Sequence, residues 1–191
     1  MNGLFFGTTL IKRYLYTFIL FLISNGMEAQ VVNVSGSWTA SIPSITEAGT
    51  NYAGTYDNTA NTGTNQIILS GTLPGSFLKV LSSSGAKMTM HYASNPWNTS
   101  MTLSAKRTGG TTTIHGVCLL CTASINGGAS YIPIPQASDV TFVTFTFGGV
   151  LGLGNSVTFD DIVLLLQVSG VSVTIPAGTY GARVVFTIVA N

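Results

Sequence analysis

Two cysteines and a histidine lie close together in this chain, and their spacing suits chemistry better than that of any other residues. Cys118 and Cys121 form a CxxC pair, and His115 precedes it by three residues. Such a group could bind zinc, act as a redox pair or form a disulfide. Zinc is disfavoured because a second pair of ligands is missing. Thioredoxin-like chemistry is disfavoured because no helical pattern follows to lower the thiol pKa.

The cysteine pair is therefore expected to be structural. On a continuous strand the Cα atoms of Cys118 and Cys121 would lie about 10 Å apart, beyond the roughly 7 Å that a disulfide tolerates. A disulfide therefore requires a turn at Leu119 and Leu120. In an oxidising compartment we expect a local disulfide that holds this turn, with buried free thiols as the alternative.

The other titratable side chains form no recognisable catalytic set. Both histidines, His91 and His115, fall in polar stretches, and the sequence has no G-x-S-x-G, HExxH or P-loop motif. Asp160 and Asp161 point to opposite faces of a regular strand, so they are not a ready acid–base pair. No acidic cluster has the spacing of a known calcium loop. We predict a protein that is not an enzyme, with no catalytic residue, metal site or cofactor.

The beginning of the chain has the features of a secretory signal peptide. Lys12 and Arg13 form a positive start, the run 14–24 is apolar, and small residues follow. This run is shorter than the roughly 20 apolar residues that span a bilayer, so a helical anchor is the less favoured alternative. We expect cleavage after Ala29 or after Gly26, and export to the periplasm, the cell surface or the medium.

The predicted mature part, residues 30–191, is apolar and nearly uncharged. It follows a predicted signal peptide of residues 1–29 and has the size of a single domain. In the whole chain 46% of the residues are hydrophobic and 7% are charged, with a formal net charge of +1. This composition supports a folded core and lacks the basic surface that nucleic-acid binding needs. A surface with so little charge suits fixed assembly or attachment better than free diffusion.

Apolar and polar residues alternate with a period of two, which predicts an all-β fold. The segments 66–73, 87–93 and 100–107 each place three apolar residues on one face, and Gly, Pro, Asn and Ser clusters separate them. Gly109 and Gly110 are expected to form a hairpin turn, because glycine reaches positive φ freely. We therefore predict an antiparallel two-sheet sandwich of the Ig-like or pilin-like kind.

The C-terminal half carries apolar residues on both faces of its predicted strands. Within 157–168 the apolar positions change phase, which predicts a bulge at Asp160 and Asp161. Outward apolar positions in this strand and in the last strand, 179–190, need a second cover, unless they are ordinary scattered surface residues. A loop, a neighbouring subunit or another sheet could supply that cover. These outward positions are Val163, Leu165, Val185 and Val189.

The stretch from Val31 to Pro43 is the clearest alternating segment. One face carries Val32, Val34, Trp38 and Ile42, and the other carries Asn, Ser and Thr. Its form suits an assembly strand that is donated to a neighbouring subunit, where alternate side chains sit in pockets. We favour the simpler interpretation, in which it is the first strand of its own sheet with one buried face.

The end of the chain, 175–191 (IPAGTYGARVVFTIVAN), resembles the closing strand of small exported bacterial β-sandwich proteins. These are the fimbrial pilins, the spore-coat-U-like proteins and the domain-of-unknown-function family 4402, in which a P-A-G-x-Y turn leads into a final alternating strand. The two widely spaced cysteines that pilins join by a disulfide are absent here. The resemblance implies an exported sandwich that assembles outside the cell.

Aromatic residues in loop-like sequence suggest a further role. Tyr52, Tyr56, Trp97 and Tyr131 could form a ligand platform that stacks on sugar rings, although loop aromatics also close the ends of sandwiches. We predict a structural or adhesive surface protein, fimbria-like, that self-assembles or contacts other cell-surface proteins. A carbohydrate- or surface-binding module is the alternative. Neither a nucleic-acid partner nor a stable transmembrane anchor is expected.

Overall fold

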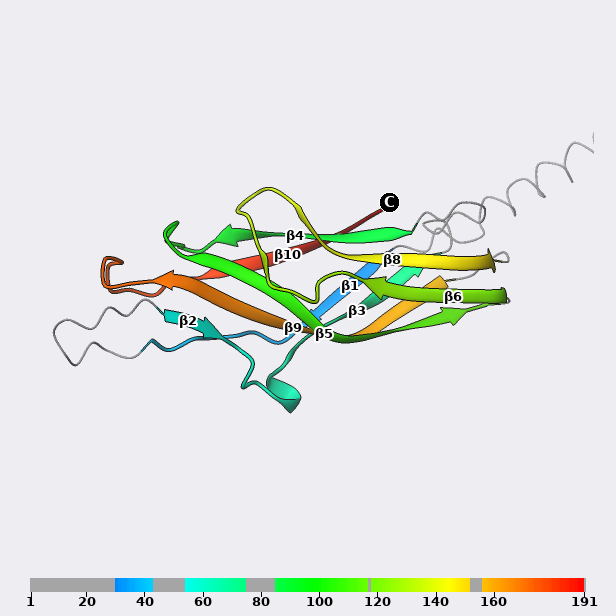
Figure 1. Ribbon diagram of the computed structural model, residues 1–191, viewed down its shortest axis with the longest axis horizontal. Coiled ribbons are helices and arrows are strands. Elements are labelled where there is room, and N and C mark those ends of the chain that lie inside the picture. Colours follow the sequence, from blue (N-terminus) through cyan, green and yellow to red (C-terminus); the bar gives the residue numbers. More distant parts are fainter. Residues whose placement is uncertain (1–29, 43–53, 75–84, 117, 152–155, 191) are drawn as a thin grey trace, which may run out of the picture.

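The computed structural model describes residues 30–42, 54–74, 85–116, 118–151 and 156–190. They form two antiparallel sheets that pack against each other, which confirms the predicted sandwich (Figure 1). The predicted signal peptide, Pro43 and Tyr52 lie outside the described residues. Within the described ranges, no helix has the length and apolar character needed to cross a membrane.

Ten strands and one 3-10 turn, η1 (Gly63–Asn65), make up the described elements. Sheet A contains β1 (Val31–Ser35), β2 (Gly54–Asp57), β3 (Ile67–Pro74), β5 (Thr102–His115), β7 (Ile132–Pro133) and β9 (Ser156–Val171). Sheet B contains β4 (Ala86–Ser94), β6 (Cys118–Asn126), β8 (Val140–Leu151) and β10 (Ala182–Ala190).

Strand β9 is the centre of sheet A. The strand order is β1-β3-β9-β5-β7, and β2 also pairs with β9. Strands β3 and β2 share one edge of β9, because β3 pairs with residues 156–164 and β2 pairs with residues 167–171. Sheet B has the order β10-β4-β8-β6, so β10 and β6 are its edges.

The core lies between the two sheets and is built from the predicted alternation. In β4, Met88, Met90 and Tyr92 are buried, and the corresponding inward residues of β3 and β5 are buried as well. Phe145 of sheet B meets Phe159 of sheet A with 4.8 Å between ring centroids. The three strands predicted from alternation in the middle of the chain are therefore confirmed.

The predicted bulge in β9 is confirmed, whereas the predicted hairpin at Gly109 and Gly110 is wrong. Asp161 has φ +57°, and one residue of β9 is extra where Leu69 and Gly71 of β3 pair with Ile162 and Phe159. Strand β5 runs through both glycines, at φ +68° and +103°, and continues to His115. Their positive φ bends β5 beside the bulge of β9, a use of glycine that resembles a turn in sequence.

A second bulge explains the mixed pattern of β8. The pairing of β4 with β8 changes register between Met88 and Thr89, which lie opposite Val143 and Thr141. Phe142 is the extra residue, and both Phe142 and Val143 are buried.

The outward apolar residues of β9 and β10 are neither buried nor fully exposed. Each of the four residues predicted to need a second cover is half-buried: Val163, Leu165, Val185 and Val189.

The favoured interpretation of Val31 to Pro43 as a strand of its own sheet is confirmed only for β1, and the single buried face predicted for the whole segment is wrong. Strand β1 pairs with β3 of its own chain and ends at Ser35. Gly36 then takes φ +91°, which ends the extended alternation. Val32 and Trp38 pack against the core, but Val34 is 51% exposed and Ile42 is 44% exposed.

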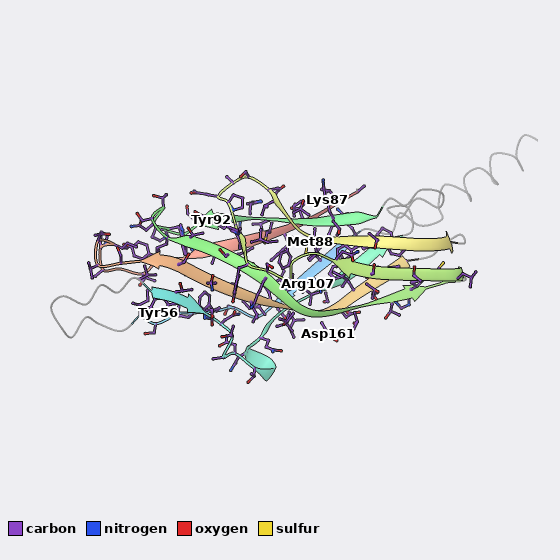
Figure 2. The ribbon with its side chains drawn as sticks, in the orientation of Figure 1. Tyr56, Lys87, Met88, Tyr92, Arg107 and Asp161 are labelled. Carbon is purple, nitrogen blue, oxygen red and sulfur yellow. The ribbon has the colours of Figure 1, made fainter. Side chains whose placement is uncertain are left out.

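Arg107 of β5 joins the two sheets at the edge formed by β6, near the middle of the sandwich (Figure 2). Its guanidinium donates hydrogen bonds to the carbonyls of Gly127 (Nε, 2.7 Å), Gly109 (Nη1, 2.6 Å) and Ile125 (Nη2, 2.9 Å). Thr112 Oγ1 donates to the Ala123 carbonyl at 2.9 Å. Side chains of β5 thus occupy acceptors along the edge of β6.

Replacing Arg107 with alanine is expected to lower the free energy of unfolding by about 1–2 kcal/mol, because three carbonyls lose a charged donor near solvent. Arg107→Lys should recover only part of this loss, since an ammonium group cannot bridge three acceptors in a fixed fork. Urea unfolding measures the difference. Lys87→Ala, which removes a half-buried cation from β4, is the control, and equal midpoints for R107A and K87A would contradict the bridging role.

Candidate functional site

The edges of the two sheets differ in how they are protected. Exposed strand edges carry unpaired N–H and C=O groups, which proteins usually shield by short strands, Pro, bulges or covering side chains. Strand β7 has two residues, of which one is Pro133, and β2 and β1 have four and five. The edge of β6 is bridged by Arg107 and Thr112. Among the described edges, β10 has none of these features, and its single charge, Arg183, lies near its start.

Strand β10 is long, regular and nearly uncharged. Its nine residues pair with β4 without a register shift, and they contain no proline and one charge, Arg183. Among the described residues, no strand pairs with the other side of β10, although β10 also lies close to β1 of sheet A. Alternate residues of such an edge direct their N–H and C=O groups outward. The β10 edge can therefore accept another strand.

A cavity of about 600 Å³ lies next to the start of β10, between the two sheets. Its floor is apolar and includes Leu103 and Leu166 of sheet A and Val184 of sheet B. Its walls include the segment 38–42 that follows β1, and the segment 178–181 that precedes β10. The cavity and the open edge therefore lie in one region of the molecule.

Four aromatic side chains from four separate segments line this cavity. They are Trp38, Tyr56, Trp97 and Tyr180, and each is half-buried. Tyr56, on β2 of sheet A, lies in the same half of the sandwich as Tyr92 on β4 of sheet B (Figure 2). The Tyr92 ring lies against Trp97, with 5.7 Å between the ring centroids.

The structure brings together only part of the predicted ligand platform. Tyr56 and Trp97 share the cavity, and two residues of the predicted assembly strand, Trp38 and Ile42, also line it. Tyr131 is not among the lining residues. The predicted platform does not include Tyr180, although this tyrosine belongs to the P-A-G-x-Y turn of the sequence.

Tyr131 lies instead beside two charged side chains of sheet A. Lys106 Nζ is 4.6 Å from the centroid of its ring. Burial raises the pKa of Tyr131 above its ordinary value, and the negative charge of Asp57 adds to the rise. Hydrogen bonds from the hydroxyl and the backbone N–H of Thr59 lower the pKa of Asp57, and Lys106 acts in the same direction. This group is a local charge arrangement apart from the cavity.

The CxxC segment lies in a bulged part of β6. Cys121 is disulfide-bonded, and the chain has one other cysteine, Cys118. Leu120 has φ +53°, and the pairing of β6 with β8 changes register between Leu119 and Thr122. The three-residue interval from Leu119 to Thr122 in β6 thus lies opposite a two-residue interval in β8. This irregularity is the kind of backbone turn that a CxxC disulfide requires.

The two histidines lie at separate surface positions. His91 Nδ1 is 2.8 Å from Asp139 Oδ1, in an exposed pair, and His115 Nε2 is 3.2 Å from Thr158 Oγ1. Within the described ranges, no three His, Cys, Asp or Glu side chains are placed to hold a metal ion.

No protein-family model, curated protein or solved structure matches this chain. The resemblance of 175–191 to exported bacterial sandwich proteins therefore stays a prediction, and function is inferred from the open edge and the cavity.

Proposed function

We propose that this protein is an exported, non-enzymatic surface subunit, structural or adhesive, that self-associates through the open edge of β10. The observation that carries this proposal is the contrast between β10 and the other described edges, which are short, carry proline or are bridged by side chains. A long, flat and apolar edge strand is a template for pairing with another chain.

A second copy of the chain fits this edge in charge and pattern. If two β10 strands paired antiparallel about a twofold axis at Phe186, Arg183 of one copy would lie opposite Val189 of the other. No like charges would meet, and two four-stranded sheets would join into one continuous sheet. The inward residues of β10 already pack on their own core, so association would need only the free backbone groups and the outward side chains.

Two features of the sequence support the exported, assembling role. The predicted signal peptide and the resemblance of 175–191 both favour export, and the low charge of the chain favours fixed assembly. Strand β1 pairs with β3 of its own chain. The proposal therefore concerns the acceptance of a strand by β10 and not the donation of Val31 to Pro43.

Val185→Lys tests the proposal. Val185 lies on the outer side of β10, half-buried and opposite His91 of β4. A lysine on an edge strand opposes pairing with a second strand, because in the twofold arrangement the two introduced ammonium groups would be diagonal neighbours on one face of the joined sheet. We expect the mature wild-type protein to show concentration-dependent oligomers in sedimentation velocity, and the V185K variant to remain monomeric with unchanged circular dichroism.

Thr122→Lys is the matched control, because Thr122 is exposed on β6, the opposite and bridged edge of sheet B. This variant should assemble like the wild type. A wild type that stays strictly monomeric at high concentration would refute self-association. Equal loss of assembly in T122K and V185K would refute the role of the β10 edge.

A further inference from the structure

The aromatic cavity has the composition of a ligand site. Its four aromatic rings come from four segments, so the fold gathers them at one place although they are far apart in sequence. Each ring remains half-buried and none belongs wholly to the core. A cavity of about 600 Å³ falls within the usual range for small-molecule sites, roughly 300–1,000 Å³.

Hydrogen bonds hold two of the aromatic side chains in place. Trp97 Nε1 donates to the Met101 carbonyl at 3.2 Å, and the Tyr180 hydroxyl donates to the Pro176 carbonyl at 2.7 Å. The polar group of each ring is thus satisfied by the protein itself. Their faces are positioned before a ligand arrives, which lowers the entropic cost of binding.

The lining of the cavity contains no charged residue, which favours a neutral ligand. Polar groups are nevertheless present, because Thr39, Ser41 and Thr179 lie at the exposed parts of the wall. Hydroxyl groups both donate and accept hydrogen bonds, so they match a ligand that is rich in hydroxyls.

From this combination we infer that the cavity binds a neutral sugar ring. The C–H face of a hexose would lie against an aromatic face, and its hydroxyls would meet the Thr and Ser hydroxyls of the wall. An acidic or basic ligand would enter without a counter-charge. A purely apolar chain would form no hydrogen bond with the wall hydroxyls. The inference concerns a different site from the β10 edge and does not depend on self-association.

Tryptophan fluorescence offers a direct test, because the chain has two tryptophans, Trp38 and Trp97, and both line the cavity. The mature protein is first screened against an array of neutral and acidic glycans. The best neutral glycan is then titrated against the protein in solution. A saturable change in tryptophan emission is expected, and calorimetry should give the same association constant.

Substitutions then locate the site. Trp38→Ala is expected to lower the association constant about tenfold or more, as the loss of one stacking face does in other ring-binding sites. Trp38→Phe, which keeps an aromatic face, should retain most of the affinity. Tyr180→Ala is a second cavity variant with the same expected loss. Tyr131→Ala removes an aromatic residue outside the cavity and should bind like the wild type.

Three outcomes would overturn the inference. The first is a protein that binds no neutral glycan, whatever its state of assembly. The second is binding of acidic glycans, or of a neutral apolar dye such as N-phenyl-1-naphthylamine, without binding of neutral sugars. The third is glycan binding that Y131A weakens as much as W38A does.

Discussion

Replacing Asn58 with alanine is expected to lower the free energy of unfolding by about 2–4 kcal/mol, because two buried backbone groups would lose their partners. Asn58 is 2% exposed. Its Nδ2 donates to the Leu164 carbonyl at 3.2 Å, and its Oδ1 accepts from the Leu166 N–H at 2.7 Å. Its own N–H donates to the Leu166 carbonyl at 3.2 Å.

Asn58 fills the gap between β3 and β2 along the edge of β9, where neither strand pairs with residues 165 and 166. Its side chain therefore forms the hydrogen bonds to β9 that the backbone of a neighbouring strand would otherwise form. Asn58→Asp keeps the acceptor but loses the donor and buries a charge, so it should be no more stable than N58A at neutral pH.

Chemical denaturation of N58A and N61A measures the effect. Asn61 is a matched control, because its Nδ2 also donates to a carbonyl, that of Asn65, but in an exposed turn. N61A should change the free energy of unfolding by less than about 0.5 kcal/mol. Similar midpoints for the two variants would show that Asn58 does not stabilise the pairing on this side of β9.

Replacing Phe159 with alanine is expected to cost about 3–5 kcal/mol, the range for a large aromatic side chain removed from a packed core. Phe159 is fully buried and contacts Phe145 across the two sheets. Its ring also occupies the space above Gly71, where an added Cβ would lie 2.5 Å from Phe159 Cζ. The ring therefore joins sheet B to sheet A at the place where β1 and β3 are paired.

Phe159→Leu should cost less than F159A because leucine leaves a smaller cavity. Unfolding in urea, followed by circular dichroism, should show a lower midpoint for F159A with an unchanged dependence on denaturant. A loss below about 1 kcal/mol for F159A would mean that the two sheets do not depend on this contact.

Burial and bulges could be predicted from the sequence where the alternation within a single strand determines them. The inward positions of β4 follow directly from a period of two, and the bulge of β9 follows from the change of phase at Asp160 and Asp161. Prediction failed where one residue type serves two geometries. Gly109 and Gly110 have the positive φ of a turn, but they bend a strand that continues. Gly36 is similar: the alternating pattern continues past it in the sequence, but its positive φ ends the extended strand in the structure.

The candidate site was only partly predictable for a related reason. Tyr56 and Trp97 could be named as exposed aromatics, but their common cavity is formed by segments that are distant in sequence. The role of Asn58 had no local signal, because an asparagine after a short strand usually marks a turn. The unprotected edge of β10 became visible only once the other edges had been placed.

The central position of β9 has a consequence for the order in which the chain can fold. Its partners β2, β3 and β5 all precede it, and Asn58 is 108 residues away from the Leu166 N–H that it binds. During synthesis these strands cannot pair with β9 until nearly the whole chain has left the ribosome. Pairing over such separations is slow, on the order of milliseconds to seconds, even in small β-proteins. We therefore expect the newly made chain to expose several unpaired strands at once, a stage at which a chaperone would have the most to protect.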